Sequence, residues 1–221
     1  MKVLVYTVSY GYPKPEYIKY TSEINSKYSE AHGYDYREFI LPDDFPRHAA
    51  WGRVWFLKEN LENYDYMLYI DGDAFVVDPS RSLDELISHM VGYPAACGLF
   101  AADEMLSNKT FHDTLPNAGV FLFSRENSGL DMATRWWDVP YSNIEGTIHD
   151  QDRYLDCKDS LYNHPYEQLA LWFLWEKFSM NFRFTQSYTD LNGLDGTFIR
   201  HLMKMPDVYR TKLIKQYYNE L

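Results

Sequence analysis

Residues 67–74 read MLYIDGDA, an apolar run that ends in two carboxylates separated by one glycine. An apolar run of this length is typical of a strand buried on both faces. The acids then lie at its carboxyl end, where open α/β sheets bind their ligands. If the strand continued through Asp73, both carboxylates would point the same way, and Gly72 would leave room beside them. We interpret Asp71 and Asp73 as a candidate site for a divalent cation that carries phosphate oxygens, with an ordinary turn as the alternative.

Segments with strand and helix patterns alternate on both sides of this run. Before it, the pattern predicts strands over Val3–Val8 and Tyr36–Ile40 and helices over Glu16–Ala31 and Trp51–Leu61. After it, the pattern predicts strands over Ala95–Phe100 and Gly119–Phe123 and helices over Leu83–Met90, Leu130–Trp137, Tyr166–Phe178 and Asp207–Leu221. This order favours an α/β fold with a central, mostly parallel sheet flanked by helices. The polar stretch from Asp138 to Pro165 is long enough for a functional loop or lid.

The composition narrows the classes of partner. With 21 Lys plus Arg against 32 Asp plus Glu in 221 residues, the formal charge of -11 opposes binding to nucleic acid or to an anionic membrane. An anionic substrate would then need a local solution such as a bound metal. The two cysteines, Cys97 and Cys157, form no disulfide framework or metal-ligand cluster, which fits a reducing compartment.

No apolar run approaches the length of a membrane-spanning helix, and the amino terminus is too short in its apolar part for a signal peptide. We expect one soluble, cytoplasmic domain, either complete or the catalytic domain of a larger protein. The aromatic content is high, with 20 Tyr, 13 Phe and 6 Trp. Core packing is the default explanation for these rings, and stacking against sugar faces in a groove is the alternative.

Several common catalytic motifs are missing. The chain has no phosphate loop, no dinucleotide-binding glycine fingerprint, no zinc-protease helix and no esterase nucleophile elbow. Four scattered features remain: the two carboxylates, Asn117-x-Gly119 at a strand entry, Glu167-Gln168 at a helix start, and His201 near the end of the chain.

In this order the features resemble the nucleotide-sugar glycosyltransferases of the GT-A fold, and most closely the galactosyl/mannosyl/xylosyltransferase family. The resemblance covers most of the chain and runs through Val3–Ser9, Ala31–Tyr34, Trp51–Arg53, Tyr69–Ala74, Asn117–Leu122, Glu167–Leu171 and Ile199–His201. The Asp-x-Asp-Ala core together with the late histidine is its most specific part. The chain departs from the family in length and at Leu202–Lys204, where other residues usually follow the histidine.

The resemblance implies a metal site with three protein ligands. Asp71, Asp73 and His201 would hold Mn2+ or Mg2+ on the donor diphosphate, and an imidazole among oxygen ligands favours Mn2+. Lys204 would neutralise the leaving diphosphate. Without the resemblance, a lone histidine is more often structural, and Lys204 would be an ordinary surface lysine.

The resemblance also assigns contacts to the donor nucleotide. Thr7, Val8 and Tyr10, from the first strand and the loop after it, would lie against the nucleotide, and Arg53 and Asp71 would contact it as well. Lys58 is a further, weaker candidate for the same role.

The acceptor side of the expected site centres on Glu167 and Gln168. By resemblance, Glu167 would orient the acceptor hydroxyl or shield developing positive charge, and Gln168 would hydrogen-bond the sugar; a carboxylate at a helix start also complements the helix dipole whatever its function. Asn117, Gly119 and Asp152 would contact the substrate. Asp150, Gln151 and Asp152 together form a rival acid-amide group in the long polar stretch.

The resulting hypothesis is a metal-dependent glycosyltransferase with a single GT-A domain, in which residues 1–100 bind the nucleotide and residues 101–221 bind the acceptor. It would move a sugar from a UDP- or GDP-linked donor to a carbohydrate hydroxyl, with retention of configuration. Two alternatives remain. One is a Mg2+-dependent phosphatase of the haloacid-dehalogenase type, which normally carries its Asp-x-Asp on the first strand; the other is a carbohydrate-binding module without enzymatic activity.

Overall fold

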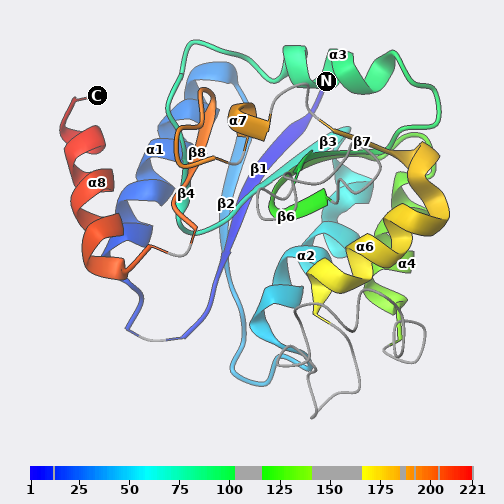
Figure 1. The fold of residues 1–221 in the computed structure, drawn as a ribbon, viewed down its shortest axis with the longest axis horizontal. Helices are drawn as coiled ribbons and strands as arrows, with labels where there is room; N and C mark the ends of the chain where they lie inside the picture. The colour runs from blue at the N-terminus through cyan, green and yellow to red at the C-terminus, as the bar shows by residue number, and fades with distance from the viewer. Residues whose placement is uncertain are drawn as a thin grey trace.

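A central sheet lies between two groups of helices in the computed structural model of the chain (Figure 1). The structure describes residues 1–11, 13–102, 116–140, 166–184, 188–191, 193–203 and 205–220. Its strands are β1 (Val3–Ser9), β2 (Asp35–Ile40), β3 (Tyr66–Ile70), β4 (Ala74–Val76), β5 (Gly98–Ala102), β6 (Pro116–Ser124), β7 (Phe182–Phe184) and β8 (Ile199–His201). Its α-helices are α1 (Glu16–His32), α2 (Gly52–Asn60), α3 (Asp84–Val91), α4 (Gly129–Asp138), α6 (Glu167–Phe178), α7 (Tyr188–Leu191) and α8 (Asp207–Glu220).

The main sheet has the order β2-β1-β3-β6-β5-β7. The pairs β1–β2, β1–β3 and β5–β7 are parallel, whereas β6 is antiparallel to both of its neighbours. A separate pair, β4–β8, is antiparallel. The expectation of a mostly parallel central sheet flanked by helices is confirmed.

Most predicted elements are present with shifted ends, and the structure adds four short ones. The predicted strand over Ala95–Phe100 begins only at Gly98, and the predicted strand over Gly119–Phe123 begins earlier, at Pro116. The added elements β4, β7, β8 and α7 have three or four residues each, which is too short for a recognisable hydrophobic period. The segment predicted to form a loop or lid, residues 138–165, lies outside the described residues from position 141 onward.

The two faces of the sheet have separate cores. On one face, Leu4, Tyr6 and Val8 of β1 pack in a cluster with α2, α4 and α6. On the other face, Val3 and Val5 pack in a second cluster with parts of α1, α3 and β8. Because strand side chains alternate, a strand with every residue buried serves both cores at once, as the uninterrupted apolar sequence predicts.

Most aromatic rings contribute to packing. Tyr6, Phe56 and Tyr69 form a chain of ring contacts with centroids 5.0 and 5.1 Å apart, and Phe100, Phe121 and Trp136 continue the same core. The default explanation for the aromatic content therefore holds for these buried rings.

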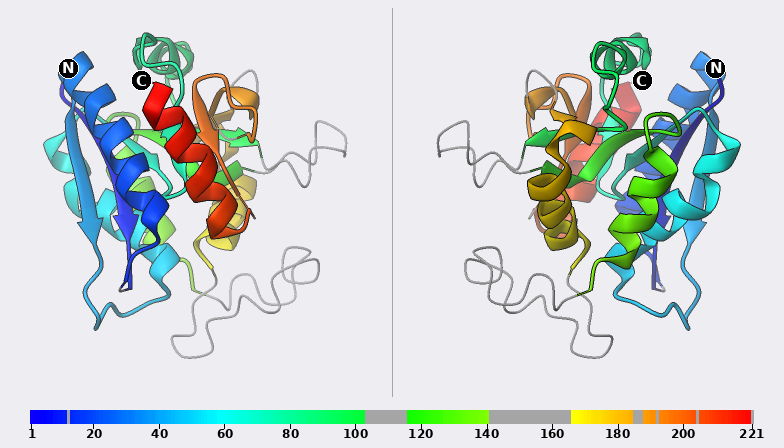
Figure 2. Two further views of the ribbon diagram at one scale, coloured as in Figure 1. Left: turned by 90° about the vertical axis from the view of Figure 1, so that its left-hand side faces the viewer. Right: turned by 90° about the vertical axis from the view of Figure 1, so that its right-hand side faces the viewer.

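The carboxy-terminal helix α8 lies along α1, on the side of the sheet away from α2, α4 and α6 (Figures 1 and 2). A third cluster joins the two helices to the β4–β8 pair through Phe75, Leu202 and Ile214. Among the described residues, no helix has both the length and the apolar character needed to cross a membrane.

Candidate active site

The predicted strand does not run through both acids. β3 ends at Ile70, and a turn closed by a 2.9 Å hydrogen bond from Ala74 N to Asp71 O follows it. The turn was the alternative interpretation of this stretch, and it brings the carboxylates together by bending the chain, so the strand alternation expected for Asp71 and Asp73 is wrong. The turn itself is a means of building the site.

His201 reaches the same place from a distant part of the sequence. β8 pairs with β4 so that His201 lies opposite Ala74, next to the turn. His201 Nε2 is 3.0 Å from Asp73 Oδ1 and 3.8 Å from Asp71 Oδ2. One ligand atom from each of the three residues lies within 4.8 Å of the others. The predicted metal-ligand set therefore converges.

Gly119 makes room for this histidine. A Cβ atom at Gly119 would lie 2.4 Å from His201 Cε1, closer than side chains can approach. The carbonyl oxygen of Gly119 also accepts a 2.9 Å hydrogen bond from Asp71 N. Gly72, inside the acidic turn, differs: a Cβ atom there would meet only Ile18, at 3.7 Å. The glycine that the site needs is thus Gly119.

The pairing of β5 with β6 is irregular at the residues around Gly119. Between Phe100 and Ala101 of β5, the pairing register on β6 jumps from Phe121 to Asn117, so the intervening residues leave the ladder. Asn117 Oδ1 accepts from Gly119 N at 2.7 Å, and Gln168 Oε1 accepts from Ala118 N, also at 2.7 Å. Side chains thus satisfy backbone donors that the β5–β6 ladder does not pair.

Two of the predicted substrate contacts therefore have a structural task. Both polar atoms of the Gln168 amide bond to the β6 backbone, because Nε2 donates to Pro116 O while Oε1 accepts from Ala118 N. Asn117 is 8 % exposed and contacts Met203 Sδ at 3.9 Å through its amide nitrogen. Both side chains hold the strand entry beside the acids, and their contact with a sugar stays a prediction.

Arg53 connects the metal-ligand group to Glu167. It extends from α2, with its Nη2 3.3 Å from Asp71 Oδ1 and its Nη1 3.6 Å from Glu167 Oε1. The same Nη1 donates to Ala118 O at 2.8 Å, and the guanidinium lies 4.9 Å from the centre of the Tyr69 ring. Burial disfavours its charge, but Asp71, Tyr69 and Glu167 outweigh burial, so the pKa of Arg53 is raised and the side chain stays cationic.

Glu167 is a buried carboxylate with spare hydrogen-bonding capacity. It is 5 % exposed, and its Oε2 has no hydrogen-bond partner among the described residues. A buried charge normally has its lone pairs satisfied. Oε2 is therefore an enclosed acceptor without a described partner, and Glu167 is not among the residues that line the neighbouring pocket.

Arg210, for which the sequence carries no recognisable signal, binds the other side of the acidic turn. Its Nη2 is 3.0 Å from Asp73 Oδ2. Burial raises the pKa of Asp73, but the nearby His201 and Arg210 lower it by more, so this carboxylate ionises below its ordinary range. The site thus holds two carboxyl groups between two arginines.

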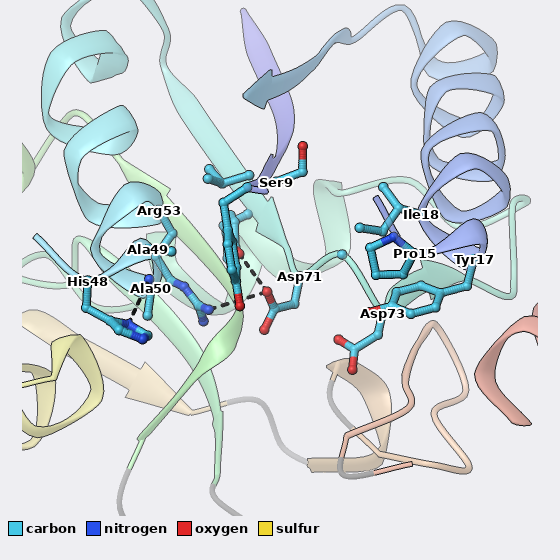
Figure 3. A pocket seen from close by; sticks show the side chains of 14 residues that line it. Ser9, Pro15, Tyr17, Ile18, His48, Ala49, Ala50, Arg53, Asp71 and Asp73 are labelled. Carbon is cyan, nitrogen blue, oxygen red and sulfur yellow. Dashed lines mark hydrogen bonds and ion pairs between the residues drawn. The ribbon is translucent and has the colours of Figure 1, made fainter. Parts of the chain in front are cut away.

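A pocket of about 310 Å3 opens beside the acids, at the carboxyl ends of β1 and β3 (Figure 3). Its lining includes Val8, Tyr10, Arg53 and Asp71, all of them predicted to contact the donor nucleotide. Thr7, predicted for the same role, is 3 % exposed and does not line the pocket, and its hydroxyl has no hydrogen-bond partner among the described residues.

His48 forms the far wall of this pocket, opposite Asp73 (Figure 3). Its Nδ1 accepts from Ala50 N at 3.2 Å, and its Nε2 is 3.1 Å from the Tyr166 hydroxyl. His48 carries no signal in the sequence, because the segment before α2 has no hydrophobic period.

Three further candidates remain. Lys58 bonds Glu59 at 2.8 Å and does not line the pocket. Lys204 and Asp152 lie outside the described residues, so their roles stay predictions.

The donor chemistry of the cluster fits a hard divalent cation. Two carboxylates supply oxygen ligands of the kind that Mg2+ and Mn2+ prefer, and the imidazole nitrogen moves the preference toward Mn2+. Asp71, Asp73 and His201 are the residues that would hold the ion.

The fold can be compared with the folds of solved proteins. The chain has the GT-A glycosyltransferase fold, because solved glycosyltransferases align with nearly all of it. One, involved in the glycosylation of the major capsid of PBCV-1, aligns with a TM-score of 0.66 and 14% identity over 98% of this chain and 100% of that one.

Two further structures agree. The galactosyltransferase LgtC, solved with donor and acceptor sugar analogs, aligns with a TM-score of 0.52 and 12% identity over 99% of this chain and 96% of its own. Mouse xyloside xylosyltransferase 1 aligns with a TM-score of 0.51 and 8% identity over 84% and 85% of the two chains. At such identities the likeness shows the fold. The sequence matches no protein-family model and no curated protein.

Proposed function

We propose that the protein is a metal-dependent glycosyltransferase that moves a sugar from a UDP- or GDP-linked donor to a carbohydrate hydroxyl, with retention of configuration. The observation that carries the proposal is the convergence of Asp71, Asp73 and His201 beside a 310 Å3 pocket in a GT-A fold. Three solved structures that share this fold are a glycosyltransferase, a xylosyltransferase and a galactosyltransferase. That the chain is most similar to the galactosyl/mannosyl/xylosyltransferase family is also part of the proposal.

The residues divide the work of such a reaction. A cation on Asp71, Asp73 and His201, Mn2+ by preference, would neutralise charge on the departing diphosphate. Arg53 fixes Asp71 and adds a permanent positive charge next to the site. Glu167, whose unpartnered oxygen is enclosed beside Arg53, would have to become accessible in the bound state to accept a hydrogen bond from a sugar hydroxyl and position it at the reacting carbon.

Calorimetric titration of UDP, GDP and their sugar conjugates, with Mn2+ and with chelator, tests the proposal. Wild type is compared with Asp73→Ala and with Asp131→Ala, which removes an exposed acid that pairs with Arg135 on α4. We expect Mn2+-dependent binding of one nucleotide by wild type and Asp131→Ala, and loss of that binding in Asp73→Ala.

Other outcomes favour the alternatives. No nucleotide binding under any metal condition refutes the transferase and leaves the carbohydrate-binding module. Release of phosphate from a phosphomonoester, without nucleotide binding, supports the phosphatase. That alternative expects its motif after the first strand, whereas Asp71 follows β3.

A further inference from the structure

Arg210 on α8 connects the two chain segments that supply the candidate metal ligands. Its Nε donates to Leu202 O at 3.0 Å, directly after His201, and its Nη2 lies 3.0 Å from Asp73 Oδ2. Leu202 N in turn donates to Asp73 O at 3.1 Å. One guanidinium therefore joins the acidic turn to the end of β8.

The contact leaves the two oxygens of Asp73 in different situations. Oδ2 is held by Arg210, whereas Oδ1 faces His201 Nε2 at 3.0 Å. Only Oδ1 then points into the group formed by Asp71 and His201.

Arg210 is itself held in place. Its Nη1 lies 3.2 Å from Asp207 Oδ1, one helical turn earlier, and 3.3 Å from the Tyr17 hydroxyl on α1. Its side chain is 17% exposed. A planar guanidinium with several fixed partners transmits this rigidity to the groups that it bonds.

We propose that Arg210 is a positioning residue of the cation site: it sets the spacing between Asp73 and His201 and makes Asp73 a ligand through Oδ1 alone. The inference rests on the metal site of the proposed function. Arg210 has two opposing effects on cation affinity, because its charge repels the cation while its fork orients the ligands.

A lysine separates these effects. It keeps the positive charge but offers one nitrogen, which cannot hold both Asp73 and Leu202 in the geometry of the guanidinium. We expect Arg210→Lys to weaken Mn2+ binding by roughly 10-fold, the lower end of the range for residues that orient metal ligands. Arg210→Met also removes the charge that repels the cation, so we expect it to lose less Mn2+ affinity than Arg210→Lys does.

The experiment uses Mn2+ alone, followed by calorimetry and by electron paramagnetic resonance of the bound ion. The matched control is Lys215→Met, which removes another contact of α8 with α1, the ion pair to Glu16 at 2.5 Å. The control should keep the wild-type affinity and spectrum, whereas Arg210→Lys should change both. Tyr17→Phe removes only the bond to Arg210 and should weaken binding about 2- to 3-fold, a milder case of the same loss.

The outcomes are distinguishable. If wild type binds Mn2+ and both Arg210→Lys and Tyr17→Phe bind it equally well with the same spectrum, the positioning role is refuted and the proposed function stands. If Lys215→Met loses as much affinity as Arg210→Lys, docking of α8 is the cause, and the role of Arg210 is refuted as well. If wild type binds no Mn2+, the metal part of the proposed function fails together with this inference. Thermal unfolding in chelator shows whether each variant is folded, and Tyr17→Phe decides the matter if Arg210→Lys is not.

Discussion

At the scale of single residues, the two glycines near the acids have opposite tolerances. Gly119→Ala would bring a Cβ atom to 2.4 Å from His201 Cε1 and so displace the imidazole, whereas Gly72→Ala makes only an ordinary 3.7 Å contact with Ile18. We expect Gly119→Ala to weaken Mn2+ binding at least 10-fold and Gly72→Ala to change it little. Calorimetry with Mn2+ compares the two. Equal affinities would show that His201 does not bind the ion.

The buried arginine is expected to be important for stability. Arg53→Met leaves Glu167 buried and Asp71 half-buried without their cation, a loss worth about 3 to 5 kcal/mol of unfolding free energy. Urea denaturation in chelator measures it. Adding Glu167→Gln to the same chain removes one uncompensated charge and should restore part of the loss; additive losses would mean that the two residues are not coupled.

The depressed pKa of Asp73 predicts a pH dependence. The folded pKa lies below the unfolded value of about 4, so the stability from the ionised form is fully present above that value and disappears as the pH falls through the folded pKa. In chelator, the unfolding free energy of wild type should exceed that of Asp73→Asn at pH 7, and the gap should narrow below about pH 4. A gap that stays constant to pH 2 would show that Asp73 gains nothing from His201 and Arg210.

The candidate metal ligands were easier to predict from the sequence than the residues around them. Asp71 and Asp73 were recognisable because acids end an apolar strand, and His201 because of a resemblance. Arg210 and His48 carry no such signal. Each acts through a contact with a residue far away in the chain, and one sequence does not contain that pairing.

At the scale of elements, α8 contributes one fully buried side chain. Ile214 is 0% exposed and packs in the cluster with Phe75 and Leu202, while its neighbour Leu213 is 43% exposed. Ile214→Ala should lower the unfolding free energy by about 2 to 4 kcal/mol, and Leu213→Ala by less than about 1 kcal/mol. Chemical denaturation compares the pair. Similar losses would mean that α8 is not docked as described.

The prediction of elements depended on their length. The longer helices were predicted close to their observed bounds, since their periods repeat often enough to recognise, whereas the strands β5 and β6 were predicted with shifted starts. The strands β4 and β8 were not predicted, although they bring His201 to the acids. Three residues show no period, and their pairing depends on the rest of the fold.

At the scale of the whole molecule, the two halves expected to bind nucleotide and acceptor share one sheet. β3 from the first half pairs with β6 from the second, and Trp51 contacts Trp137 with ring centres 5.7 Å apart. The guanidinium of Arg47 covers both rings, at 4.7 and 3.7 Å from their centres. Such shared packing predicts one cooperative transition. Tryptophan fluorescence and far-UV circular dichroism should give the same midpoint, and two midpoints would show separate units.

The alternation of strand and helix patterns was enough to predict the α/β class, and the resemblance predicted the GT-A form that the solved structures confirm. The antiparallel direction of β6 was beyond reach. The strand is antiparallel to both β3 and β5, and a fully buried apolar strand does not report its direction in its sequence.

The hydrogen bond between His201 and Asp73 joins residues 128 positions apart. During synthesis, the acidic turn, Arg53 and most of the pocket wall are made long before the histidine. A chain that stopped before β8 would therefore hold both acids but lack His201 and Arg210, and one that stopped between β8 and α8 would lack only Arg210. Under the proposed function, the wall of the donor pocket exists early in synthesis, whereas the cation site is completed only after β8 and α8 have been made.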